Sequence, residues 1–146
     1  MSVSLEMEGL ERLQDVLTNF SRFRADFRKK LPRAVMREQK KLIRERITKK
    51  KRGPDGETWA PWSLDYAKTR KAGNSLLIGR RKLVNSFRVA ATAGKATLGS
   101  SLPYAAAQHF GLPGRNLPAR PYFGVGKEDA RQLDDLITAW VKERWP

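Results

Sequence analysis

Hydrophobic and polar residues alternate at the start of the chain, and the period then changes. Residues 2–7 read SVSLEM, in which every second side chain is apolar, and this alternation predicts a short β-strand. After Gly9 the apolar residues recur at steps of three and four, which is typical of an amphipathic α-helix. This stripe consists of Leu10, Leu13, Leu17, Phe20, Phe23 and Phe27. We expect it to pack in the hydrophobic core.

A second long helix is predicted over residues 32–50. Pro32 is expected to separate it from the first helix, because proline suits the first turn of a helix and disrupts a helix interior. The apolar side of the second helix holds Leu31, Val35, Leu42, Ile43 and Ile47. The opposite side is basic and holds Arg33, Arg37, Lys40, Lys41 and Arg44. Residues 22–52 contain fifteen Lys or Arg and three acids, a net charge of +12, so most of the positive charge lies here.

Shorter elements are predicted in the middle of the chain. The loop 53–62 reads GPDGETWAPW, and we expect its two tryptophans to dock on the body of the domain. Ser63 can cap a short helix over residues 64–71. Another short helix ends near Ser86, and residues 87–98 then alternate around an Ala-Gly-Lys turn, which predicts a β-hairpin.

Prolines and glycines punctuate residues 102–126, which read LPYAAAQHFGLPGRNLPARPYFGVG. Residues 103–111 predict a short helix that is opened by proline and ended by glycine. Residues 112–126 predict an extended arm, because Pro118 and Pro121 cannot both lie inside a helix. Such an arm, stiffened by prolines, is suited to shaping an interface.

The arm and the last segment complete the predicted fold. Tyr122 and Phe123 are expected to enter an apolar site. Residues 127–145 predict a closing helix with acids in its first turn and bases in its last, which complements the helix dipole. Residues 1–146 are therefore predicted to form a single domain of the α+β class, with a small antiparallel sheet packed against long helices.

Composition restricts the partners of such a domain. The chain has 30 Lys or Arg against 15 Asp or Glu, a net charge of +15, and no cysteine. Three kinds of negatively charged partner would be attracted to this charge: nucleic acid, an anionic membrane surface or an acidic protein. The absence of cysteine excludes disulfides and thiolate metal sites. No long apolar run and no signal peptide is evident, so we expect no membrane partner and synthesis in a cytoplasm.

The basic side of the second helix has two interpretations. Its five cations can contact phosphates, with binding that weakens as salt rises. Alternatively, they are solvated or face an acidic partner subunit. No helix-turn-helix, zinc finger or stacking motif accompanies them, so sequence-specific reading of DNA is not expected.

Residues suited to catalysis are sparse. His109 is the single histidine, and its apolar surroundings favour a hydrogen-bonded structural role. The adjacent acids in Glu128-Asp129 and Asp134-Asp135 point about 100° apart on a helix, so neither pair forms a carboxylate clamp. Phosphate-binding glycine motifs and a nucleophile elbow are missing. We expect no enzymatic activity, no cofactor and no metal.

Four motifs, taken in order, are similar to those of the phage virion morphogenesis (tail completion) family of Mu-like tailed phages. The segment PDGETWAPW at 54–62 resembles the family's P-D-G-x-x-W-x-P, and LLIGRRKLVNS at 76–86 resembles its Leu-Leu…Gly-Arg-Leu…Ser. The segment PYAAAQHFG at 103–111 resembles P-Y-A…H-x-F-G, and PARPYFG at 118–124 resembles P-A-R-P-F-L/F-G. In the second motif Arg80, Arg81 and Lys82 separate the glycine from the leucine, whereas the family places that leucine two residues after the glycine.

The resemblance implies a tail-terminator-like fold and a structural role in the virion, late in assembly. It implies a subunit of a ring, commonly a hexamer, at the head–tail junction, where the partners are the tail tube and the head connector or neck proteins. The basic helix would then face either DNA passing through the channel or an acidic neighbour. Candidate subunit-interface residues are Trp59, Trp62, Tyr104, Arg120, Tyr122 and Phe123, with packing in the chain's own core as the alternative for the aromatic residues.

Two rival functions come from other classes. A non-specific DNA-binding accessory protein of phage assembly would bind duplex as a monomer or dimer. A lytic or processing enzyme would need a catalytic group, for which His109 and Asp134 are the residues to test.

Overall fold

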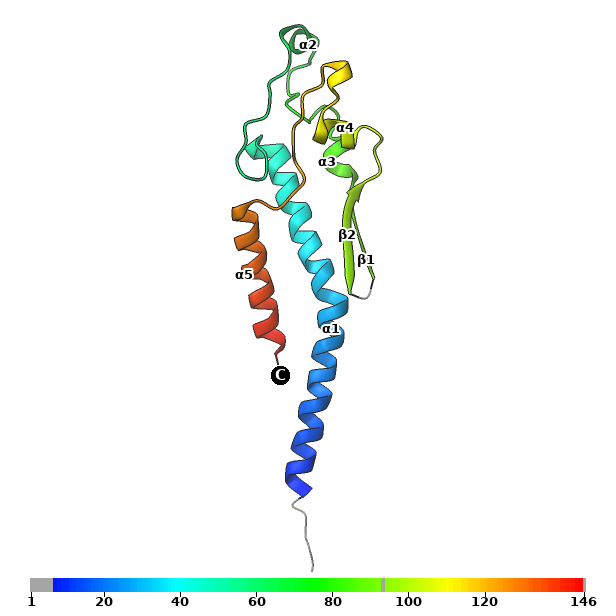
Figure 1. Cartoon of the computed structure of the whole chain (residues 1–146), viewed down its shortest axis with the longest axis vertical. Helices are drawn as coiled ribbons and strands as arrows, with labels where there is room; N and C mark the ends of the chain where they lie inside the picture. The colour runs from blue at the N-terminus through cyan, green and yellow to red at the C-terminus, as the bar shows by residue number, and fades with distance from the viewer. Residues whose placement is uncertain (1–6, 93, 146) are drawn as a thin grey trace, which may run out of the picture.

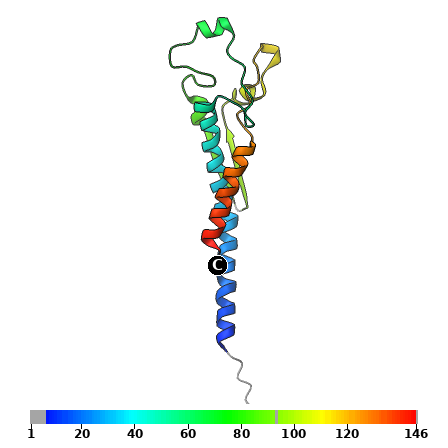
Figure 2. The ribbon, with the colours of Figure 1, turned by 90° about the vertical axis from the view of Figure 1, so that its left-hand side faces the viewer.

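A computed structural model describes residues 7–92 and 94–145 of the chain. The molecule is elongated along one long helix, α1 (Met7–Glu45), with a hairpin and the C-terminal helix beside it (Figure 1). Loops and short helices gather at one end of the long axis, and the first turns of α1 extend alone at the other (Figure 2). The predicted strand at 2–7 lies outside the described residues except for Met7, which begins α1.

The predicted break between two helices at Pro32 is wrong. Helix α1 is continuous, and Pro32 lies inside it. A proline in a helix leaves the carbonyl four residues earlier without its usual donor. Here that carbonyl belongs to Arg28, and it accepts a 2.8 Å hydrogen bond from the backbone N–H of Gly94 instead. A tertiary contact thus satisfies the group that the proline leaves free, and the helix continues.

A π-helical turn, η1 (Arg46–Lys50), ends this long element, and Lys51 follows in the left-handed conformation. Beyond it the loop 51–63 leads to α2 (Leu64–Lys68). The Ser63 hydroxyl caps α2 by accepting from the backbone N–H of Tyr66, as the sequence predicts, although α2 is shorter than expected.

The hairpin lies where the alternation of residues predicts it. It follows α3 (Lys82–Ser86) and pairs β1 (Phe87–Thr92) with antiparallel β2 (Lys95–Ser100). Both strands contact α1, and α5 (Lys127–Arg144) contacts α1 as well. In Figure 1 the hairpin and α5 lie on opposite sides of α1. The predicted α+β class, with a small antiparallel sheet against long helices, is confirmed.

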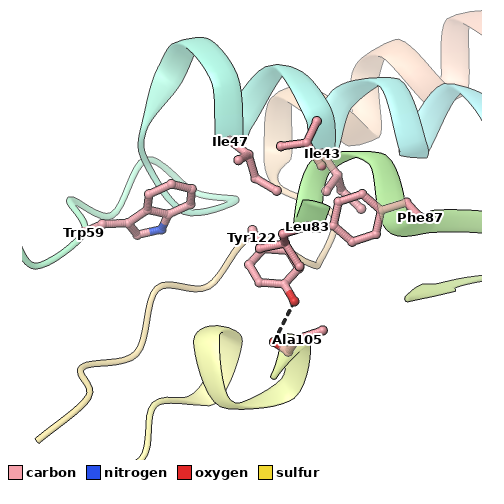
Figure 3. Packing of buried hydrophobic residues seen from close by; sticks show 8 residues of the cluster. Ile43, Ile47, Trp59, Leu83, Phe87, Ala105 and Tyr122 are labelled. Atoms are coloured by element: carbon pink, nitrogen blue, oxygen red, sulfur yellow. Dashed lines mark hydrogen bonds between the residues drawn. The ribbon is translucent and has the colours of Figure 1, made fainter. Parts of the chain in front are cut away.

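The hydrophobic core lies at the loop end of α1, as Figure 3 shows. The last turns of α1 and η1 supply Ile43 and Ile47, and α3 supplies Leu83 and Val84. The remaining buried members are Trp59, Phe87, Ala105 and Tyr122. The short helix α4 (Ala105–Phe110) ends at Gly111, whose φ of 78° is left-handed. The arm then passes through a single 3-10 turn, η2 (Pro113–Arg115), and continues without helix to residue 126.

The stripe on the first half of α1 is not in the core. Phe23 and Phe27 pack with Trp140 of α5, and Phe20 and Phe23 contact the Trp145 ring. Helix α5 ends at Arg144, so the turns of α1 before Phe20 have no element beside them in the described chain. The expected core packing is therefore wrong for Leu13, Leu17, Phe20 and Phe27, which are 43–57% exposed.

Candidate functional site

Two of the four motifs contact each other although about sixty residues separate them. The indole N–H of Trp59 donates a 2.9 Å hydrogen bond to the carbonyl of Pro121. In return, Arg120 donates from Nε to the carbonyl of Ala60 at 2.9 Å and from Nη2 to that of Pro61 at 3.1 Å. The arm is thereby fixed to the loop 53–62.

The third motif holds the aromatic residues of the arm through His109. Its Nδ1 accepts from the backbone N–H of Tyr122 at 3.2 Å and of Phe123 at 3.3 Å. Burial lowers the pKa of His109, and the neutral ring is the form that can accept. The expected structural role of His109 is confirmed.

The Tyr122 side chain anchors the arm in the core. Its hydroxyl donates a 2.7 Å hydrogen bond to the carbonyl of Ala105, the contact drawn in Figure 3. Burial raises the pKa of Tyr122 to about 12. The tyrosine therefore remains a neutral hydrogen-bond donor far above neutral pH, and the arm and α4 remain joined.

A buried ion pair holds the last part of the arm and the start of α5. Arg46 and Asp129 are both more than nine-tenths buried and form a direct salt bridge. Arg46 also donates to the carbonyls of Tyr122 and Gly124, and the Asp129 carboxylate accepts from the N–H of Gly126 at 3.0 Å. Gln39 adds a 2.9 Å bond to the Gly124 carbonyl. Arg46 falls in the apolar phase of its helix beside Ile43 and Ile47, and this position in the pattern could have singled it out.

The six candidate interface residues do not share one environment. Trp59 and Tyr122 are buried in the chain's own core, so core packing describes these two aromatic residues, while Arg120 is buried with its guanidinium on backbone carbonyls of the loop 53–62. Trp62 and Phe123 are half-buried, and Tyr104 is exposed. Whether any of the six lies beside a subunit contact stays a prediction; Trp62, Phe123 and Tyr104 are the ones with solvent-exposed surface.

The basic side of α1 faces solvent. Arg33, Arg37, Lys41 and Arg44 are exposed, and Lys40 is half-buried. Within the described chain, Lys41 alone of these five has a carboxylate partner, a 3.5 Å contact to Glu38. Exposed pairs of this kind contribute little, so the four exposed cations are available to an outside partner.

A cavity of about 800 Å³ lies at the loop end of the molecule, between the segments 61–66, 70–83 and 104–120. Its cationic lining residues are Arg70, Arg80, Lys82, Arg115 and Arg120. None of its lining residues is Asp or Glu. The guanidinium of Arg70 lies over the rings of Trp62 and Tyr66, at 5.7 and 5.0 Å from their centroids. The sequence pattern did not indicate this cavity, because its cations are dispersed along the chain.

The described residues contain neither a metal-binding cluster nor a membrane-spanning helix. Across residues 7–92 and 94–145, no three side chains among His, Cys, Asp and Glu are grouped so that they could hold a metal ion. No helix in these residues combines the length and the apolar character that crossing a membrane requires.

Comparison with known proteins gives the family. No curated protein and no solved structure matches the chain. The model of the phage virion morphogenesis family matches residues 8–142, which include all four motifs, the basic side of α1 and the lining of the cavity. Proteins of this family have a structural role in phage assembly and are associated with the virion. Because the match spans nearly the whole chain, the protein belongs to the phage virion morphogenesis family.

Proposed function

We propose that the chain is a ring-forming tail terminator or tail completion subunit at the head–tail junction of a tailed bacteriophage. Its partners are further copies of itself, forming a ring that is hexameric in the simplest case, together with the tail tube and the head connector or neck proteins. Membership of a virion assembly family supports this proposal.

The main structural support for this proposal is an exposed apolar surface near the start of α1. The first turns of α1 extend past the rest of the molecule with Leu13, Val16, Leu17 and Phe20 at 47–58% exposure. Large apolar side chains grouped on one surface mark a binding surface, because their burial is favourable by about 25 cal/mol per Å². A lone chain leaves this surface in water, whereas an assembly subunit covers it.

The first test is the mass of the purified protein by light scattering, over a range of protein and salt concentrations. A single species of several subunits, whose size does not grow with concentration, is expected for a closed ring. If the ring forms only on tail tubes, electron microscopy of tubes mixed with the protein should show added density at one tube end. A chain that stays monomeric and leaves the tubes bare would overturn the proposal.

A second candidate function rests on the basic side of α1. Arg33, Arg37, Lys41 and Arg44 are exposed on one helix, which suits non-specific contact with DNA phosphates. In a ring they would meet DNA in the channel, and in an accessory protein they would bind duplex directly. Changing these four residues to glutamine should reduce the slope of log K against log salt by about 0.9 per lost phosphate contact. An unchanged slope would remove these residues from DNA binding.

A further inference from the structure

The cavity at the loop end of the molecule (Figure 1) carries positive charge that nothing beside it balances. Five cations and no acid line its volume of about 800 Å³. One of them, Arg120, is committed to the carbonyls of Ala60 and Pro61. The other four have no carboxylate partner within the described residues: Arg70, Arg80, Lys82 and Arg115. Because like charges held together repel one another, the cavity is suited to an anionic ligand.

Arg70 is held at the cavity wall by its neighbours. Its guanidinium lies over the rings of Trp62 and Tyr66, and a Cβ at Gly79 would lie 3.1 Å from its Nη2. The Nε of Arg70 is buried without a hydrogen-bond acceptor among the described residues. A guanidinium presents its N–H donors in a planar fork that matches a carboxylate. Arg70 is therefore a positioned cation with a donor that the described chain leaves unused.

The cavity also has an apolar wall, formed by Leu77, Ile78, Leu83 and Leu117. Leu77 has a φ of 59°, in the left-handed region that glycine adopts freely and leucine adopts at a cost. Its half-buried side chain packs against the core and lines the cavity. A strained leucine at this position keeps apolar surface in the wall that a glycine would not supply. A ligand that fills the cavity must therefore offer apolar surface as well as negative charge.

We propose that this cavity is the docking site for a short acidic and apolar segment of a neighbouring virion protein. Carboxylates of the segment pair with Arg70, Arg80 and Arg115, and an apolar side chain beside them covers Leu77 and Leu117. The inference rests on the proposed function, because a subunit at the head–tail junction holds a different protein as well as its own copies. It names the surface and the chemistry of that contact.

Two other occupants fit the cavity less well. Each copy of this chain carries a net charge of +15, so electrostatic attraction favours a different, acidic protein over a further copy. Duplex DNA carries its phosphates on the outside of a wide rod, which reaches the rim of a cavity but not its inner wall. A single strand would leave the apolar wall in water, and Arg70 already covers the rings of Trp62 and Tyr66 that would stack its bases.

The first experiment identifies the segment by selection from random short peptides displayed on yeast. The full-length natural chain selects binders, and a charge variant with Arg80→Glu and Arg115→Glu, both at exposed positions, removes those that bind elsewhere. The surviving peptides should carry Asp or Glu beside Leu, Ile, Val or Phe. No survivors, or survivors without an acidic residue, would overturn the inference.

Calorimetry then measures how the selected peptide binds to variants of the full chain. The charge variant should bind it at least about tenfold more weakly than the natural chain. Leu77→Gly removes apolar surface at a backbone conformation that glycine favours, so the turn is retained and affinity should fall about fivefold. Affinity should also decrease as added salt screens the charges. Equal affinity for the natural chain and the charge variant would place the peptide outside the cavity and overturn the inference.

Two controls separate docking from a general effect of charge or of folding. Lys95→Glu with Lys142→Glu makes the same change in net charge at exposed positions outside the cavity, and this variant should bind the peptide as the natural chain does. A peptide with lysines in place of its acids should bind the charge variant more tightly than the natural chain, which a misfolded variant would not show. Circular dichroism and thermal unfolding should confirm that all variants fold.

The outcomes distinguish this inference from the proposed function. An oligodeoxythymidine that binds the natural chain more tightly than the selected peptide, and loses that affinity in the charge variant, would overturn the inference in favour of nucleic acid. Rings that form although no acidic peptide binds in the cavity would overturn the inference and leave the proposed function intact. A chain that binds the acidic peptide in the cavity, but stays monomeric and leaves tail tubes bare, would support the docking site and overturn the proposed function.

Discussion

The backbone N–H of Gly94 donates a 2.8 Å hydrogen bond to the carbonyl oxygen of Arg28. In an uninterrupted α-helix that oxygen would accept from residue 32, but Pro32 has no N–H to give. The hairpin therefore packs with its turn at the one carbonyl of α1 that the proline leaves free. One proline thus links the path of the long helix to the position of the small sheet.

Replacing Pro32 by alanine should loosen this link. The new N–H competes with Gly94 for the Arg28 carbonyl, while α1 gains up to ~3 kcal/mol of helix propensity. A hydrogen bond contributes about 1 kcal/mol net, so amide exchange at Gly94 should become about fivefold faster. Hydrogen exchange followed by NMR measures this, with the Gly111 amide, bonded to the Ala107 carbonyl at 2.8 Å, as internal control. An unchanged Gly94 rate would show that the carbonyl accepts both donors.

Neutralising Asp129 should be costly, because it leaves the Arg46 charge buried without its counter-charge. Asp129→Asn is expected to lower the free energy of unfolding by about 3–5 kcal/mol, measured by urea denaturation. Asp134→Asn, on the exposed side of the same helix, should change it by less than about 0.5 kcal/mol. Arg46→Met should cost less in the Asp129→Asn background than in the natural chain. If the two changes were simply additive, the pair would not act as a unit.

Local pattern predicted much of this fold because the signals that set it are local. Each of these signals affects only residues close to it in the sequence. They are the Ser63 cap, the alternation of residues 87–98 and the glycine that ends α4. The break at Pro32 was mispredicted because the compensation comes from Gly94, more than sixty residues away. A proline rule that considers only the helix itself has no access to that donor.

The candidate site was predictable in its motifs but not in its geometry. The arm was expected to enter an apolar site with Tyr122 and Phe123, and Tyr122 is fully buried. The hydrogen bonds from Trp59 to Pro121 and from Arg120 to Ala60 depend on how distant segments pack, and the periodicity of the sequence does not encode that packing. The exposure of Leu13 and Leu17 was missed for the same reason, since the sequence does not reveal that α5 stops short of them.

His109 should make stability depend on pH in mildly acidic solution. Burial lowers its pKa in the folded chain below the ordinary 6.5, so the unfolded chain binds the proton more readily. Its contribution is therefore full above pH 6.5 and is lost as pH falls through the lowered folded value. Protonation also places a donor against the N–H groups of Tyr122 and Phe123. The urea concentration at which half of the protein is unfolded should accordingly be lower at pH 5.5 than at pH 7.

A variant isolates this effect from other titrating groups. In His109→Asn the side-chain oxygen can accept near the position of Nδ1, but it does not titrate. The decline between pH 7 and 5.5 should then flatten, even if the variant is less stable overall. An equally steep decline in the variant would assign the pH dependence to other residues.

At Gly126 a single added methyl group should destabilise the folded chain strongly. A Cβ built there would lie 1.8 Å from the carbonyl oxygen of Pro54, so either the turn at Pro54 or the start of α5 must move. No left-handed backbone is involved, because φ at Gly126 is −79°, and the cost is therefore one of space alone. Gly126→Ala should lower the free energy of unfolding by at least about 2 kcal/mol.

Gly114→Ala is the matched control, since a Cβ at Gly114 meets nothing within 4 Å. Thermal unfolding of the two variants compares them directly. Equal stability would mean that the loop 53–62 yields freely, and the contact between the first motif and α5 would then not constrain the arm.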